Sequence, residues 1–168
     1  YQPDNAVLLV AGKFDVTKTL KLINEKFGII PRPERVLTPT FTAEPTQDGE
    51  REVTLRRVGD VQQVGMAYHI PSGLHPDFIA CDVLADILTD APSGRLYKAL
   101  IDTKKASSQF GMSFQLKEPG LAYFGAEVLK EKSIDSVKKI MIETIENFAK
   151  TPPTKEEVER VKTKGIKK

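Results

Sequence analysis

Hydrophobic and polar residues alternate with a period of two over residues 109–117 and again over residues 121–129. The apolar positions of the first run are Phe110, Met112, Phe114 and Leu116, and those of the second are Ala122, Phe124, Ala126 and Val128. A period of two is typical of a β-strand with one buried face. Pro119 and Gly120, which separate the runs, favour a tight turn. The sequence therefore predicts an antiparallel hairpin whose apolar faces are covered by helices.

Three further strands are predicted from shorter patterns. Residues 6–11 (AVLLVA) form a continuous apolar run, which is typical of a strand covered on both faces. Residues 52–58 and 61–70 flank Gly59-Asp60, a pair suited to a two-residue hairpin turn. In the second of these strands the apolar face is formed by Val64, Met66, Tyr68 and Ile70.

Apolar residues with helical spacing predict the covering layer. Asp15 can cap a helix whose apolar stripe ends before Gly28, and Ser133 can cap a long helix that ends before Pro152. Two more helices are predicted over residues 77–90 and 95–102, and Thr154 with Glu157 forms the capping box of a last one. The prolines between residues 29 and 49 predict either an extended surface crossing or a strap that connects domains. This order predicts an α+β fold: a two-layer sandwich of a mostly antiparallel sheet with helices on one face.

Length and charge narrow the classes of function. The 168 residues suffice for one hydrophobic core, so we expect residues 1–168 to form a single domain. The net charge is +2, from 25 basic and 23 acidic residues spread along the chain, and this predicts no nucleic-acid partner. No apolar run is long enough to predict a membrane span. Cys81 has no partner for an internal disulfide, and the compartment stays open between bacterial periplasm and cytoplasm.

The residues that carry catalytic chemistry are few. A catalytic zinc site takes three protein ligands, whereas this chain has two histidines, His69 and His75, and one cysteine. We therefore predict no metal site and no catalytic residue in the chain itself. Arg95 and Tyr97 follow the loop APSG and could line a substrate cleft; the alternative, which we favour, is a salt-bridged arginine and a packed tyrosine.

Several motifs resemble the insulinase/pitrilysin family of zinc peptidases. These are the opening YQPDNAVLLVAGKFD, the helix end EKFG before IIPRP, and the later APSGRLYKAL with its hairpin. The resemblance covers nearly the whole chain and is to the second, C-terminal-type domain of a family half-molecule, which holds no zinc. It implies that this chain is an excised fragment, and that the zinc ligands, an inverted His-x-x-Glu-His helix and a later Glu, belong to another domain of the parent protein.

The resemblance also implies a function. Two halves of a family protease close around a peptide, and an Arg and a Tyr of the non-zinc half hold the substrate near the metal. Relatives carry them in Leu-Arg-Glu-Glu-x-Gly-Leu-Ala-Tyr, whereas residues 100–108 here read LIDTKKASS, so both positions are substituted. We therefore expect a non-catalytic, substrate-enclosing domain of a zinc metalloendopeptidase that hydrolyses peptides or unfolded proteins. Its expected partners are the peptide substrate and the other domains, or the second half, of the same protease.

Two alternatives stay open at this point. Some relatives have lost catalysis and become structural subunits of larger assemblies, and a zinc motif about a domain-length upstream would favour the protease over this role. A free-standing peptide-binding domain that uses an exposed sheet edge is the other alternative.

Overall fold

A computed structural model describes residues 2–37 and 46–166. The chain groups into two compact units, residues 1–54 and residues 55–168. Each unit is described by itself, and the expectation of a single domain over residues 1–168 stays a prediction. Part of the proline-rich crossing expected between residues 29 and 49, namely residues 38–45, lies outside the described residues.

The first unit contains the short 3-10 helix η1 (Pro3–Asn5) and the helix α1 (Val16–Phe27). The predicted cap is confirmed, because Asp15 Oδ1 accepts a hydrogen bond from Lys18 N at 2.9 Å, and α1 ends at Gly28. The predicted strand over residues 6–11 is wrong, since this run forms no strand where the structure describes it. Residues 2–37 include no buried residue, so the apolar stripe of α1 lies largely exposed.

The second unit is built on a three-stranded antiparallel sheet. Its strands are β1 (Val61–Ile70), β2 (Ser108–Ser113) and β3 (Gly120–Leu129), in the order β1-β3-β2. The predicted β2–β3 hairpin is confirmed, with Phe110 opposite Gly125. The predicted hairpin around Gly59-Asp60 is wrong: residues 52–58 form no strand, and β1 pairs instead with the distant strand β3, with Gln62 opposite Val128.

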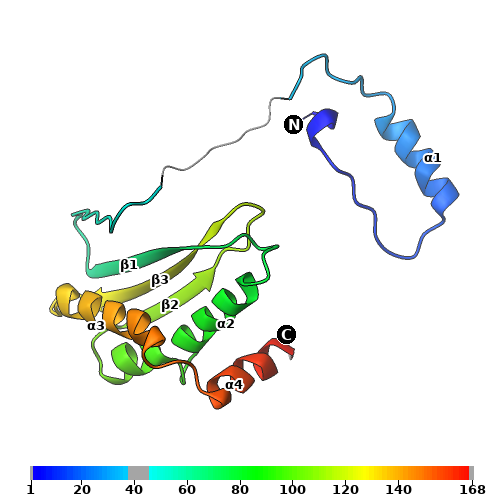
Figure 1. Cartoon of the computed structure of the whole chain (residues 1–168). Coiled ribbons are helices and arrows are strands. Elements are labelled where there is room, and N and C mark those ends of the chain that lie inside the picture. The colour runs from blue at the N-terminus through cyan, green and yellow to red at the C-terminus, as the bar shows by residue number, and fades with distance from the viewer. Residues whose placement is uncertain (1, 38–45, 167–168) are drawn as a thin grey trace. The chain divides into compact units, whose positions relative to one another are not determined.

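Helices cover one face of this sheet, which confirms the predicted α+β class (Figure 1). They are α2 (Phe78–Thr89), the π-helix η2 (Tyr97–Asp102) and α3 (Ile134–Glu146). The short η3 (Asn147–Ala149) follows α3 and leads to α4 (Lys155–Ile166), which contacts α2. None of the described helices is long and apolar enough to cross a membrane.

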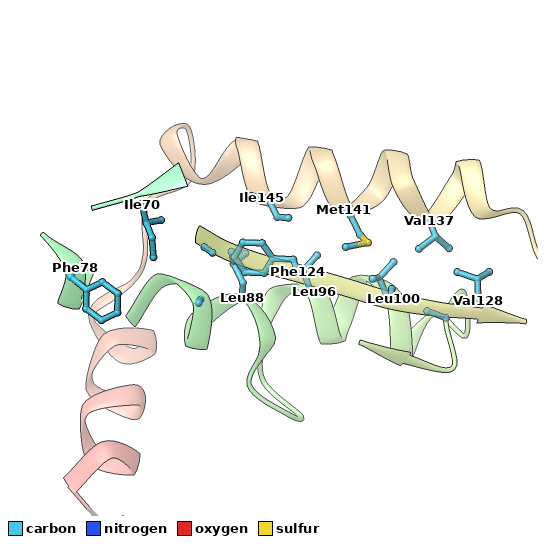
Figure 2. Packing of buried hydrophobic residues seen from close by; sticks show 14 residues of the cluster. Ile70, Phe78, Leu88, Leu96, Leu100, Phe124, Val128, Val137, Met141 and Ile145 are labelled. Atoms are coloured by element: carbon cyan, nitrogen blue, oxygen red, sulfur yellow. The ribbon is translucent and has the colours of Figure 1, made fainter. Parts of the chain in front are cut away.

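The core lies between the sheet and these helices. The four predicted inward residues of β3 are buried, and they contact buried residues of α2, η2 and α3 (Figure 2). The largest fully buried side chains are Phe124, Ile87, Leu88, Leu96, Leu100, Met141, Val128 and Val137. At about 25 cal/mol per Å² of apolar surface, this layer supplies most of the stability of the second unit.

The predicted orientation of β2 is wrong. Its apolar residues Phe110 and Met112 point away from the helices and keep 40% and 44% of their surface exposed. The helix side is formed instead by polar and small residues, with Gln109 Nε2 donating to the Thr89 carbonyl of α2 at 2.8 Å. A Cβ at Gly111 would lie 2.6 Å from the Thr89 side chain, so a larger residue would force α2 away from β2.

Candidate functional site

Arg95, one of the two predicted substrate-lining residues, holds α4 to the rest of the second unit. Its Nε and Nη2 donate to the two carboxylate oxygens of Glu157 at 2.9 and 2.8 Å. Its Nη1 and Nη2 also donate to the carbonyls of Thr151 and Pro152. The guanidinium carbon lies 4.4 Å from the ring centroid of Phe148, a cation–π contact. We call this group, Arg95 with Glu157, Thr151, Pro152 and Phe148, the Arg95 clasp.

Glu157 connects the Arg95 clasp to the start of α4. Its carboxylate accepts a hydrogen bond from Thr154 N at 2.8 Å, while Thr154 Oγ1 accepts from Glu157 N at 3.2 Å, which confirms the predicted capping box. The hydrogen bonds from Arg95 outweigh the effect of partial burial and lower the pKa of Glu157 from 4.5 to about 2. The same pairing raises the pKa of Arg95.

Tyr97, the other predicted substrate-lining residue, is half-buried at the start of the π-helix η2. The interactions of Arg95 match the alternative that the sequence favoured, a salt-bridged arginine. Because all three of its guanidinium nitrogens already donate within the chain, Arg95 has few donors left for a ligand. The substrate-lining role of both residues stays a prediction.

Within residues 55–168, none of the described helices covers the second face of the sheet. We call it the open face. On it the outward side chains of the three strands lie in neighbouring rows: Tyr123 stands between Ala67 and Met112, and Gly125 between Gly65 and Phe110. The large apolar residues that keep more than a third of their surface exposed on these strands are Val61, Phe110, Met112, Leu121 and Leu129.

Two aromatic rings on the open face lie over glycines. The centroids of Phe110 and Tyr123 are 5.7 Å apart with an interplanar angle of 41°. A Cβ at Gly125 would collide with the Phe110 ring, and a Cβ at Gly65 would collide with the Tyr123 ring and hydroxyl. Because the two glycines have no Cβ, both rings can pack directly against the sheet. We call Phe110, Met112, Tyr123, Gly65 and Gly125 the aromatic platform.

Polar contacts flank the aromatic platform on the same face. Glu127 accepts hydrogen bonds from Gln63 Nε2 at 3.2 Å and from Ser108 Oγ at 3.0 Å, one on each carboxylate oxygen. His69 lies toward the other end of β1, opposite Leu121. The open face thus has a neutral apolar centre between an engaged carboxylate and a histidine.

The described residues do not fit a zinc ion. In residues 2–37 and 46–166 no three side chains of the kinds His, Cys, Asp and Glu are gathered so that they could hold a metal. His69 is on the open face, whereas His75 Nδ1 accepts from Asp77 N at 3.2 Å in the loop before α2. We therefore derive no catalytic step through a metal in this chain.

The sequence reasoning missed the aromatic platform because it placed Phe110 and Met112 in the core. A signal for it was present. β3 has apolar residues on both faces, because Leu121, Tyr123 and Leu129 occupy the positions that alternate with its buried residues. A strand that is apolar on both faces indicates a second surface that does more than face water.

Comparisons with known proteins identify relatives over nearly the whole chain. Residues 1–164 match the family model described as the peptidase M16 inactive domain. The zinc protease PqqE of Helicobacter pylori is 28% identical over 165 residues, which is 96% of this chain and 37% of that protein. This chain thus spans well under half the length of that curated relative.

Solved structures show the same fold. A protease from Helicobacter pylori, 27% identical, matches 98% of this chain and 41% of its own with a TM-score of 0.86. The inactive peptidase domain of a proposed zinc protease from Bordetella parapertussis is 43% identical and matches 68% of this chain and 63% of its own, with a TM-score of 0.61. The family resemblance inferred from the sequence motifs is confirmed.

Proposed function

Because the chain belongs to the family of peptidase M16 inactive domains, we propose that it is the substrate-enclosing domain of a zinc metalloendopeptidase. In this proposal the parent protein hydrolyses peptides or unfolded proteins, and zinc is held by another domain or by the second half of the same protease. The chain itself forms part of the wall of the chamber in which the peptide is enclosed. The observation that supports the proposal is the open face: within residues 55–168 helices cover one side of the sheet, and apolar side chains lie on the other.

The chemistry of such a wall follows from its surface. Binding of apolar side chains to an exposed apolar face is favourable, because it removes apolar surface from water. Such side chains are accessible in peptides and unfolded chains but not on most folded proteins. Water-excluding walls also strengthen electrostatic interactions around a substrate. The wall therefore supports binding and exclusion, while hydrolysis takes place elsewhere in the parent protein.

The first test is a paired assay of zinc content and peptidase activity. It compares this chain with the natural gene product that carries it. We expect stoichiometric zinc and chelator-sensitive cleavage of an unfolded protein in the gene product, with the folded form of the same protein cut much more slowly. Stoichiometric zinc or cleavage in this chain alone would contradict the proposal. Absence of both from the gene product would favour an assembly subunit instead.

A second test asks whether substrate reaches the open face. A photo-crosslinking residue is placed at Met112 on the open face or, as a control, at Ile79, which is 71% exposed on helix α2. In the chelator-treated gene product we expect a labelled unfolded substrate to crosslink at position 112 and not at position 79. Equal crosslinking at the two positions would indicate non-specific contact and would count against enclosure by this face.

A further inference from the structure

Helix α4 is attached to the second unit differently from α3. The buried side chains of α3, Val137, Met141 and Ile145, belong to the main core, and α3 contacts β1 and β3. Helix α4 instead contacts α2 at the edge of the unit (Figure 1), and Val161 is the one residue of its described part that is buried. Because the free energy gained by burial grows with the apolar area that is covered, α4 gains much less from it than α3.

Ion pairs near the two ends of α4 add to this attachment. Glu157 in its first turn binds Arg95, and Lys164 in its last turn donates a hydrogen bond to the carboxylate of Asp90. Arg95 and Asp90 lie on either side of the short loop 91–94, so one loop holds both ends of the helix. The Asp90 side chain keeps 7% of its surface, and a carboxylate that is so nearly buried needs a cationic partner.

Arg160, on the same helix, opposes the docked position. Two of its guanidinium nitrogens, Nε and Nη2, are buried, and neither has a hydrogen-bond partner among the described residues. A buried charge without an acceptor has lost hydration and gained no interaction in return. Undocking of α4 would return the guanidinium to water, so this cost applies only to the docked helix. Arg160 therefore favours undocking.

We propose that α4 is a reversibly docked helix, which separates from α2 while the sheet and the helices that cover it stay folded. Val161 and the two ion pairs favour the docked position, and Arg160 favours the undocked one. Peripheral elements with few buried contacts commonly open at a lower free energy than the whole fold. Undocking would separate Arg95 from Glu157 and uncover the side of α2 that α4 contacts. Because salt weakens ion pairs that reach the surface, as Lys164 does, the position of α4 responds to ionic strength.

The test uses this chain alone and does not depend on its proposed function. Amide hydrogen exchange is measured by NMR under native conditions, and each rate is divided by the rate of the same amide in an unfolded peptide. We expect amides of α4, such as that of Val161, to exchange about 100-fold faster than amides of α3, such as that of Met141. In about 1 M salt, where the Debye length falls to about 3 Å, exchange in α4 should become about threefold faster still, and exchange in α3 should not change. Equal protection of the two helices would overturn the proposal.

Two matched variants separate docking from the general stability of the helix. Arg160→Met and Lys164→Met lie four residues apart, remove one positive charge each and introduce the same side chain, and the three residue types have similar helix propensities. Lys164→Met leaves Asp90 without its cation, so exchange in α4 should become about tenfold faster. Arg160→Met removes the unpaired charge, so exchange in α4 should become about fivefold slower. Unchanged exchange in α3 establishes that the rest of the unit is folded. Changes in the same direction in the two variants, or no change in Arg160→Met, would contradict the proposal.

Discussion

The replacement Glu157→Gln tests the Arg95 clasp with the least change in shape. It removes the charge that pairs with Arg95 but leaves an amide oxygen that can still accept one of its hydrogen bonds. The two side chains retain only 17% and 20% of their surface, so solvent screens the pair less than it would screen a surface ion pair. We therefore expect a measurable loss of stability at neutral pH.

The size of the loss follows from the pKa of Glu157. One pKa unit corresponds to about 1.4 kcal/mol, so lowering the pKa from 4.5 to about 2 corresponds to about 3 kcal/mol. The folded pKa is the lower one, so the unfolded chain takes up the proton first as the pH falls. This contribution is complete above the ordinary value of 4.5 and is lost as the pH falls toward 2.

Urea denaturation from neutral pH down to about pH 2 provides the measurement. We expect Glu157→Gln to be less stable than the parent by up to about 3 kcal/mol at neutral pH. The difference should shrink to a small remainder near pH 2, where the parent side chain is a neutral acid in the unfolded chain and about half protonated in the folded one. The control is Glu156→Gln, which neutralises the exposed neighbour and should change the pH dependence little. A difference that stays constant across this pH range would refute the reasoning and assign the effect to packing alone.

Three further predictions concern stability; thermal or urea denaturation measures the first two, and amide exchange measures the third. Gly111→Ala should destabilise the second unit by about 1–3 kcal/mol, because Gly111 lies close to α2. The control Gly59→Ala, at a glycine with open space around it, should have little effect. Equal effects of the two substitutions would contradict the packing described for β2. Met141→Ala should lower the free energy of unfolding by about 2–5 kcal/mol, because the side chain is fully buried. The control Ile79→Ala, at an exposed residue, should lower it little. A small effect at Met141 would show that the core relaxes into the cavity. Asp15→Ala should reduce the stability of helix α1 by about 1 kcal/mol through loss of its cap, as measured by amide exchange at Lys18, and unchanged exchange would show that the cap is dispensable.

Local signals predicted most of the second unit correctly. Each of these features depends on the spacing of residues that are close together in the sequence, which can be read from it directly. They are the helix with Phe78 and Leu88, the capping box of Glu157, and the inward residues of β3. Long-range pairing was the main failure. The partner of β1 is β3, some 60 residues later, whereas residues 52–58 lie directly before β1 in the sequence and offer an alternating pattern of their own.

The Arg95 clasp illustrates the same limit at the candidate site. The sequence favours a salt-bridged Arg95, but it cannot identify Glu157, 62 residues away, as the partner. Glu157 was recognised only as half of a capping box with Thr154. Its carboxylate fills both roles at once, because its oxygen lone pairs can accept hydrogen bonds from Thr154 N and from the Arg95 guanidinium together.

The orientation of β2 shows why an alternating pattern does not by itself identify the buried face of a strand. Alternation shows that Phe110 and Met112 share a face, but a sheet has two faces, and only the position of the helices decides which one becomes core. Burying Phe110 under α2 would require more space than the close contact at Gly111 allows, so the small and polar face of β2 goes inward. The aromatic residues that remain outside contribute little to the core of this unit. Their exposure in residues 55–168 costs free energy in water, and any surface that covers them would recover it.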